Sequence, residues 1–75
     1  DLRGLTVDES VLKVDKFLDD ASLANLGEIT LIHGKGTGAL RSGIHGFLKT
    51  HSHVDSYRIG KPGEGDSGVT IVKVK

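Results

Sequence analysis

Hydrophobic residues recur every three or four positions in the first third of the chain, as they do on one face of a helix. Thr6 and Glu9 form the capping-box pattern that marks a helix start, and Gly27 follows the last apolar position. We therefore predict an amphipathic helix from about residue 7 to 24. The residues expected on its buried face are Val7, Val11, Val14, Leu18 and Ala21.

The pattern changes after residue 27. The apolar, β-branched run at 28–33 is typical of a buried strand, and the glycine-rich segment 34–38 interrupts it. Helical spacing returns from residue 39 to about 50. Two further strands are predicted at 54–59 and 69–74, separated by a loop rich in glycine.

Residues 1–4 are interpreted as the end of a first strand, which gives the order β-α-β-α-β-β. Alternating strands and helices imply right-handed crossovers between parallel neighbours. We therefore expect an α/β fold in the form of a two-layer sandwich: a four-stranded mixed sheet with both helices on one face. The other face would be partly bare. Residues 1–75 are expected to form one domain, excised from the C-terminus of a larger protein.

The composition excludes several kinds of site. The chain has eleven glycines and no cysteine among 75 residues, which excludes disulfides and thiolate metal sites. No apolar run approaches the roughly 20 residues of a membrane span, so we expect no membrane partner and a cytoplasmic setting. A domain of this size buries little surface, which places any active site in a shallow cleft.

Charge is unevenly distributed although the net charge is zero. Residues 1–28 carry seven acids and three bases, and residues 29–75 carry three acids and seven bases. Folding could gather the second group into a basic face suited to nucleic acid, or mix the two groups so that no such face forms.

The glycine segment is a candidate anion site, because it leads into a helix whose first N–H groups and dipole favour negative charge. It matches neither the P-loop nor the dinucleotide-binding pattern, so a phosphodiester backbone is the better candidate ligand. The alternative is a tight turn that needs glycine only for its backbone geometry. The residues expected to bind phosphate are Gly34, Lys35, Gly36, Thr37, Gly38 and Arg41.

Catalytic candidates come from two strand ends. If the first two strands are parallel, Asp1 and Arg3 meet His33 and Lys35 at one edge of the sheet. His33 could then act as a general acid or base, and Asp1 could bind a divalent cation or activate water. A lone histidine at a strand end is more often structural, and Asp1 could equally be a frayed terminus. His51 and His53 at the end of the second predicted helix could hold a metal, but we expect no acidic group to complete such a site.

Three motifs in order resemble the Smr (small MutS-related) domain family. Asp-Leu-Arg-Gly at 1–4 is similar to the Leu-Asp-Leu-Arg-Gly signature without its first leucine, and 33–38 is similar to its His-Gly-x-Gly-x-Gly loop. The stretch 65–72 resembles its glycine-rich approach to the last strand. The match is strongest to the C-terminal Smr domain of bacterial MutS paralogues that suppress homologous recombination.

The resemblance implies a fold like the C-terminal domain of translation initiation factor three. It also implies DNA nicking, or RNA cleavage or binding, beside the ATPase and clamp regions of a larger protein linked to stalled or collided ribosomes. The family's functional positions correspond to Asp1, Arg3, His33, Lys35, Gly36 and Gly38.

Three hypotheses follow. In the first, the domain is a nicking endonuclease in which Arg3 and Lys35 hold phosphate, Asp1 positions water or one weakly held Mg²⁺ or Mn²⁺, and His33 transfers a proton. In the second, it is a non-catalytic module that binds DNA, ribosomal RNA or a ribosome for a larger ATPase. In the third, its bare sheet face docks on the parent chain.

Overall fold

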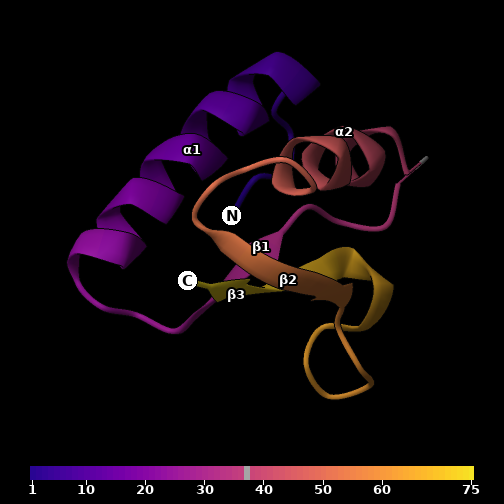
Figure 1. The fold of residues 1–75 in the computed structure, drawn as a ribbon. Coiled ribbons are helices and arrows are strands. Elements are labelled where there is room, and N and C mark those ends of the chain that lie inside the picture. Colours follow the sequence, from indigo (N-terminus) through magenta and orange to yellow (C-terminus); the bar gives the residue numbers. More distant parts are fainter. Residues whose placement is uncertain (37) are drawn as a thin grey trace.

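Two helices pack on one side of a three-stranded sheet in the computed structural model, which describes residues 1–36 and 38–75 (Figure 1). The elements are α1 (Val7–Leu23), β1 (Glu28–Ile32), α2 (Ala39–Leu48), β2 (Val54–Ile59), the 3₁₀ turn η1 (Asp66–Gly68) and β3 (Val69–Val74). The bounds of both helices and of all three strands are within two residues of those predicted from the sequence.

The capping box at the start of α1 is confirmed. The backbone N–H of Glu9 donates to Thr6 Oγ1 over 3.2 Å, and the backbone N–H of Thr6 donates to Glu9 Oε1 over 2.9 Å. These two bonds satisfy amide groups that have no partner within the helix. The helix buries Val14, Leu18 and Ala21 on its apolar side, as their spacing predicts.

The sheet is antiparallel, which corrects the expected mixed sheet. β3 lies in the centre, in the order β1-β3-β2, and both of its pairings are antiparallel. β1 and β2 therefore run in the same direction without being neighbours. The last strand is the most apolar, with five of its six residues buried, and the central position is where such a strand loses most contact with water.

The strand expected at residues 1–4 is reduced to one hydrogen bond in the described part of the chain. The backbone N–H of Leu2 donates to the Ile32 carbonyl over 2.7 Å, and Gly4 then turns away with φ of 85°. Leu2 is fully buried in the core. The fourth strand is thus not confirmed, and the likeness to translation initiation factor three stays a prediction.

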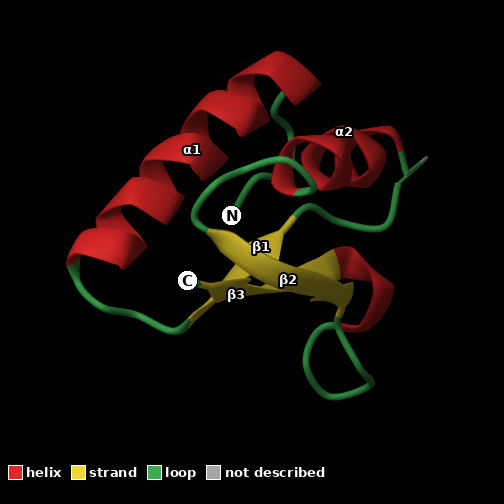
Figure 2. Cartoon of the chain, in the orientation of Figure 1, coloured by secondary structure: helices red, strands yellow, loops and turns green. Residues whose placement is uncertain are grey.

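Both helices lie on one side of the sheet (Figure 2), and the strand residues paired at Lys73 and Ile71 lie on the opposite face. Register places Glu28 and Ser56 opposite Lys73, and Thr30 and Arg58 opposite Ile71. All but Ile71 are exposed. An exposed apolar patch would favour the third hypothesis, docking of this face on the parent chain, and these residues do not provide one.

Within residues 1–36 and 38–75, no helix combines the length and the hydropathy that crossing a membrane requires.

The contact between the helices yields a matched pair of glycine substitutions. A Cβ at Gly43 would overlap Val7 Cγ1, whereas a Cβ at Gly46 would have no atom within 4 Å. We expect Gly43→Ala to lower the free energy of unfolding by about 1–3 kcal/mol through overpacking. Gly46→Ala should raise it by up to about 1 kcal/mol, because alanine favours a helix over glycine. Urea unfolding measures both, and equal effects would show that the interhelical contact is not this close.

An ion pair ties the loop after β2 to the sheet and gives a pH-dependent prediction. Arg58 donates to both oxygens of Glu64, over 2.8 and 3.0 Å, and the Lys61 amide also donates to Glu64. The Arg58 guanidinium first, and then the Lys61 amide, lower the pKa of Glu64 from 4.5 to about 2.

A carboxyl with a lowered pKa stabilises the fold above its unfolded value and loses that contribution as pH falls through the folded value. The difference in melting temperature between the native chain and Glu64→Gln should therefore be constant above about pH 5 and shrink between pH 4.5 and 2. A difference that persists unchanged at pH 2 would contradict this pairing.

Candidate nucleic-acid interface

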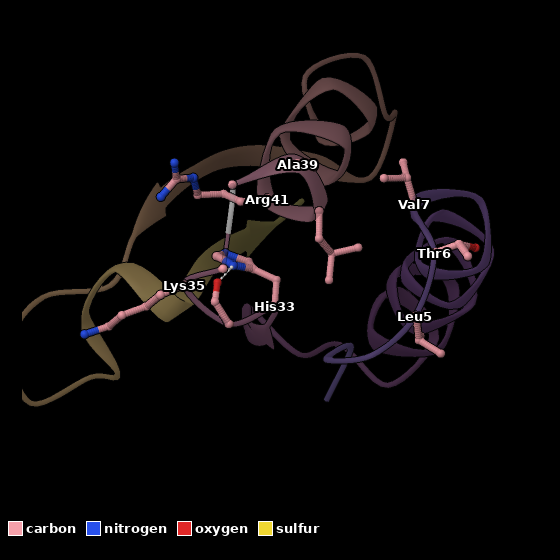
Figure 3. Close-up of a pocket in the computed structure, with 11 residues that line it drawn as sticks. Leu5, Thr6, Val7, His33, Lys35, Ala39 and Arg41 are labelled. Atoms are coloured by element: carbon pink, nitrogen blue, oxygen red, sulfur yellow. Dashed lines mark hydrogen bonds between the residues drawn. The ribbon is translucent and has the colours of Figure 1, made fainter.

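A hollow of about 320 Å³ lies where β1 ends and α2 begins (Figure 3). Leu5, Thr6 and Val7 at the start of α1 form one side of it. This space is called the His33 hollow below. Its lining includes most residues of the predicted phosphate site, namely His33, Gly34, Lys35, Gly36, Gly38 and Arg41. Thr37, the remaining predicted member, lies outside the described residues.

The glycines of this segment are required by its backbone. Gly34 and Gly38 have φ of 80° and 85°, a left-handed conformation that side chains disfavour. Gly38 occupies the N-cap position of α2 and has no side chain with which to cap it. The positive end of the helix dipole therefore faces the loop without a side-chain acceptor from its N-cap residue.

Two cations extend from this loop region. Figure 3 shows the Lys35 and Arg41 side chains projecting away from the α1 side of the hollow. Lys35 Nζ lies 3.6 Å from Asp66 Oδ2, and both side chains are exposed. A Cβ at Gly38 would lie 3.0 Å from Arg41 Nη2, so the guanidinium packs directly on the helix start. The acid beside Lys35 comes from a distant part of the sequence and was not predicted.

Arg3 lies behind the loop rather than in the His33 hollow. A Cβ at Gly34 would lie 3.3 Å from Arg3 Cγ, and Arg3 lines a neighbouring hollow together with Lys35 and Glu64. Asp1 binds Arg3 through both carboxylate oxygens, at 2.7 Å between Nη2 and Oδ2 and 3.1 Å between Nε and Oδ1. Asp1 itself borders a third, more apolar hollow. The structure thus joins Asp1 to Arg3 but does not bring Asp1 into the His33 hollow.

The surroundings of the Asp1 carboxylate do not suit a divalent metal ion. Both oxygens of its carboxylate accept hydrogen bonds from Arg3, a cation that would repel a metal. In the described part of the chain, one group of three potential metal-binding side chains lies close together. It consists of Asp15, Asp19 and His51 and does not include Asp1. The chemistry of this region is therefore considered through its protein groups alone.

His33 lies buried in the lining of its hollow, and both of its ring nitrogens have hydrogen-bond partners. The side chain is buried, with 5% of its surface exposed. Its ring nitrogens lie 2.9 Å from the Gly34 carbonyl oxygen (Nδ1) and 2.8 Å from Thr70 Oγ1 (Nε2). The backbone N–H groups of His33 and Gly34 both donate to the Gly68 carbonyl, over 3.1 and 2.9 Å. The start of the glycine loop is thus hydrogen-bonded to Gly68, the residue just before β3.

Sequence reasoning missed two residues that contact this histidine or its partner. Thr70 is fully buried in β3, and its hydroxyl also lies 2.7 Å from His45 Nε2. Thr70 is the one polar residue in an otherwise apolar run, Val-Thr-Ile-Val, and His45 follows Arg41 by one helical turn. The polar position within the apolar run and the helical spacing from Arg41 are the signals that could have identified Thr70 and His45.

His51 and His53, outside the His33 hollow, each lie near an acidic side chain of α1. His51 Nε2 lies 2.8 Å from Asp15 Oδ1, and His53 Nε2 lies 3.6 Å from Asp19 Oδ1. However, His51 Nδ1 accepts the backbone N–H of His53, which leaves the ring proton on Nε2 for Asp15. That proton occupies the lone pair that a metal would need. The cluster is therefore a polar link between α1 and the turn after α2.

Comparison with known proteins identifies the family. The family model for the Smr domain matches residues 1–75. This chain belongs to the Smr domain family. Its arrangement of glycine loop, His33 and paired Asp1 and Arg3 can therefore be described as that of an Smr domain.

Curated relatives carry this Smr domain within much longer chains. The chain is 60% identical over 75 residues to "Endonuclease MutS2" of Ruminiclostridium cellulolyticum and 59% identical to that of Acetivibrio thermocellus. In each case the whole chain is matched, but it spans only 10% of the relative's length.

Solved structures confirm the fold. The Smr domain of Thermus thermophilus MutS2 superposes with a TM-score of 0.96 at 47% identity, covering 99% of this chain and 92% of that one. YdaL, a stand-alone small MutS-related protein from Escherichia coli, gives a TM-score of 0.91 at 28% identity, covering 99% of this chain and 61% of YdaL.

Proposed function

We propose that this Smr domain is a nicking endonuclease that hydrolyses a phosphodiester bond in DNA. The observation that carries the proposal is that His33, Lys35 and Arg41 all line one hollow at the start of α2. The hollow combines an imidazole with two cations and the positive end of the α2 dipole, which is a combination suited to a phosphate group. The relatives named as endonucleases support the same reaction class.

Each group has a distinct role in this proposal. Lys35, Arg41 and the loop amides bind the phosphate and neutralise charge that develops on its oxygens. Arg3 reaches the same loop from behind, and Asp1 holds its guanidinium in place. Water attacks phosphorus, the bond to the leaving oxygen breaks, and His33 moves the proton between water and that oxygen.

The expected Mg²⁺ or Mn²⁺ enters the proposal only as an experimental variable, because the donors at Asp1 do not form a metal site. In the larger proteins that carry such a domain, nicking would serve the suppression of homologous recombination alongside an ATPase. DNA is thus the proposed substrate, and the ATPase and clamp regions are the proposed partners within the parent chain.

Incubation of supercoiled plasmid with the domain tests this proposal. We expect conversion to the open-circular form, and parallel reactions with EDTA, Mg²⁺ and Mn²⁺ determine whether a metal is required. His33→Ala serves as the inactive control in every condition. Intact DNA binding without nicking in any condition would remove the enzyme hypothesis for this domain.

The non-catalytic binding module remains the second candidate, and a specific observation favours it. Both ring nitrogens of His33 are engaged by protein groups, and the side chain is buried, as a purely structural histidine would be. In this case the loop cations bind DNA, ribosomal RNA or a ribosome for a larger ATPase acting on stalled or collided ribosomes. The low net charge makes the isolated domain a weak binder that depends on tethering.

Salt dependence separates nucleic acid from a protein partner in this second case. Binding through phosphate contacts loses affinity steeply as salt rises, by roughly one unit of logarithmic slope for each contact. We expect that behaviour with both DNA and ribosomal RNA. A flat response with ribosomes would indicate that the partner is a ribosomal protein.

A further inference from the structure

Three side chains from different elements form a continuous hydrogen-bonded chain beneath the His33 hollow. Thr70 Oγ1 lies between two histidines, 2.8 Å from His33 Nε2 and 2.7 Å from His45 Nε2. Thr70 is fully buried in the central strand, and the two imidazole rings meet edge to face at 6.1 Å between centroids. The other end of the chain is His33 Nδ1, at 2.9 Å from the Gly34 carbonyl oxygen.

Elementary donor and acceptor rules fix the direction of these bonds. A carbonyl oxygen only accepts, so His33 Nδ1 carries a proton and donates it to Gly34. In the neutral ring, Nε2 carries no proton, so it accepts a hydrogen bond from the Thr70 hydroxyl. The Thr70 oxygen in turn accepts from His45 Nε2–H. The neutral state is therefore His33 with its proton on Nδ1 and His45 with its proton on Nε2.

The same rules make it unfavourable for both rings to be charged at the same time. If His33 gains a proton at Nε2, that N–H donates to Thr70 Oγ1, and the Thr70 hydroxyl finds an acceptor within the chain only by donating to a neutral His45 that carries its proton on Nδ1. If His45 gains a proton instead, the original direction is kept and His33 stays neutral. With both rings charged, the Thr70 hydroxyl has no acceptor within the chain, and two buried or half-buried charges face each other.

We propose that Thr70 and His45 are positioning residues for His33, which fix its tautomer and make it unfavourable for both histidines to be charged at the same time. For the reaction this rests on the proposed nuclease function, since it sets the protonation state of His33 beside the loop that would bind the phosphate. The tautomers themselves are properties of the folded domain alone.

The groups around His45 agree with this assignment. Arg41 lies one helical turn before it on α2, His33 faces it from the loop after β1, and Tyr57 on β2 contacts its ring at 4.9 Å between centroids. Burial lowers the pKa of His45, and the nearby His33 and Arg41 lower it further. Charge on His45 is thus disfavoured by the same neighbour with which it shares Thr70.

Nitrogen-15 NMR of the histidine rings tests the inference without any need for activity. Long-range proton–nitrogen correlation distinguishes the two tautomers of each ring. At pH above 8 we expect the Nδ1–H form for His33 and the Nε2–H form for His45. On acidification the pair should take up two protons in separate steps, with midpoints more than about one pH unit apart. Finding the Nε2–H form at His33, or one joint step, would overturn the proposal.

A matched pair of variants isolates the hydroxyl. Thr70→Val removes it with little change in shape, and Thr70→Ser keeps it. The separation between the two titration steps should shrink in Thr70→Val and be restored in Thr70→Ser. The same separation in both variants would contradict a role for the hydroxyl. If Thr70→Val does not fold, the tautomers of the native domain still decide the outcome.

Activity provides the second readout. In a nicking assay, Thr70→Val should lower kcat with little change in KM and should displace the pH–rate profile, and Thr70→Ser should rescue both. A purely structural role would lower activity without moving the profile, which would refute the positioning role. If the domain does not nick DNA at all, the NMR result still stands, so failure of the proposed function is distinguishable from failure of this inference.

Discussion

Replacing His33 with alanine should lower the rate of plasmid nicking by about 10²–10⁴-fold, the usual contribution of a general acid or base. Affinity for DNA should change by less than about threefold, or ~0.7 kcal/mol, because the cations of the loop remain in place. The reason is spatial: His33 lies at the buried base of its hollow, whereas Lys35 and Arg41 project outward from it. Single-turnover nicking and fluorescence anisotropy measure the two effects separately.

The double variant Lys35→Ala/Arg41→Ala should mainly lose affinity for DNA, whereas His33→Ala should mainly lose rate. Lysine and arginine stay protonated near neutral pH, so they act by neutralising phosphate rather than by transferring protons. Removing both should weaken binding and lower the salt slope by up to about two units. Asp66→Asn is a useful companion, since it frees Lys35 from its acidic neighbour and should tighten binding.

Circular dichroism must first show that each variant is folded, since His33 also bonds to Thr70. If His33→Ala nicks at the native rate, and the double variant loses nicking only in proportion to binding, His33 is not catalytic. The site would then be a phosphate-binding surface, and the binding-module hypothesis would replace the nuclease.

Replacing Leu18 with alanine should lower the free energy of unfolding by about 2–5 kcal/mol. Leu18 has no exposed surface and belongs to the core formed by both helices and the sheet. Its truncation removes transfer free energy and leaves a cavity that a small, close-packed interior fills only in part. Since total stability in small domains is about 5–15 kcal/mol, a large part of it would be lost.

Leu12→Ala is the matched control on the same helix. Leu12 is 73% exposed, and alanine favours the helix slightly over leucine, so stability should change by less than about 0.5 kcal/mol. Urea unfolding of both variants gives the comparison. A large loss at Leu12 would mean that this part of α1 is covered in solution.

Local signals in the sequence were sufficient for the helices and for the glycine loop. Thr6 and Glu9 cap α1 as their spacing predicts, because a capping box depends only on residues within one turn. Gly34 and Gly38 adopt the left-handed geometry that a sharp strand-to-helix turn needs. The segment from His33 to Arg41 was accordingly predicted as one site, and the structure places its described members around one hollow.

Contacts between distant segments were decided by the tertiary structure. Nothing local indicates that β3 enters between β1 and β2, because strand order depends on which strand gains most by burial in the centre. That placement brings Thr70 between His33 and His45, and it seats η1 so that Asp66 reaches Lys35. Propensity and periodicity act over a few residues, whereas these bonds join residues that are 25 to 37 positions apart. The sequence by itself therefore determined both helices, the last three strands and the glycine loop, and packing decided which distant side chains contact one another.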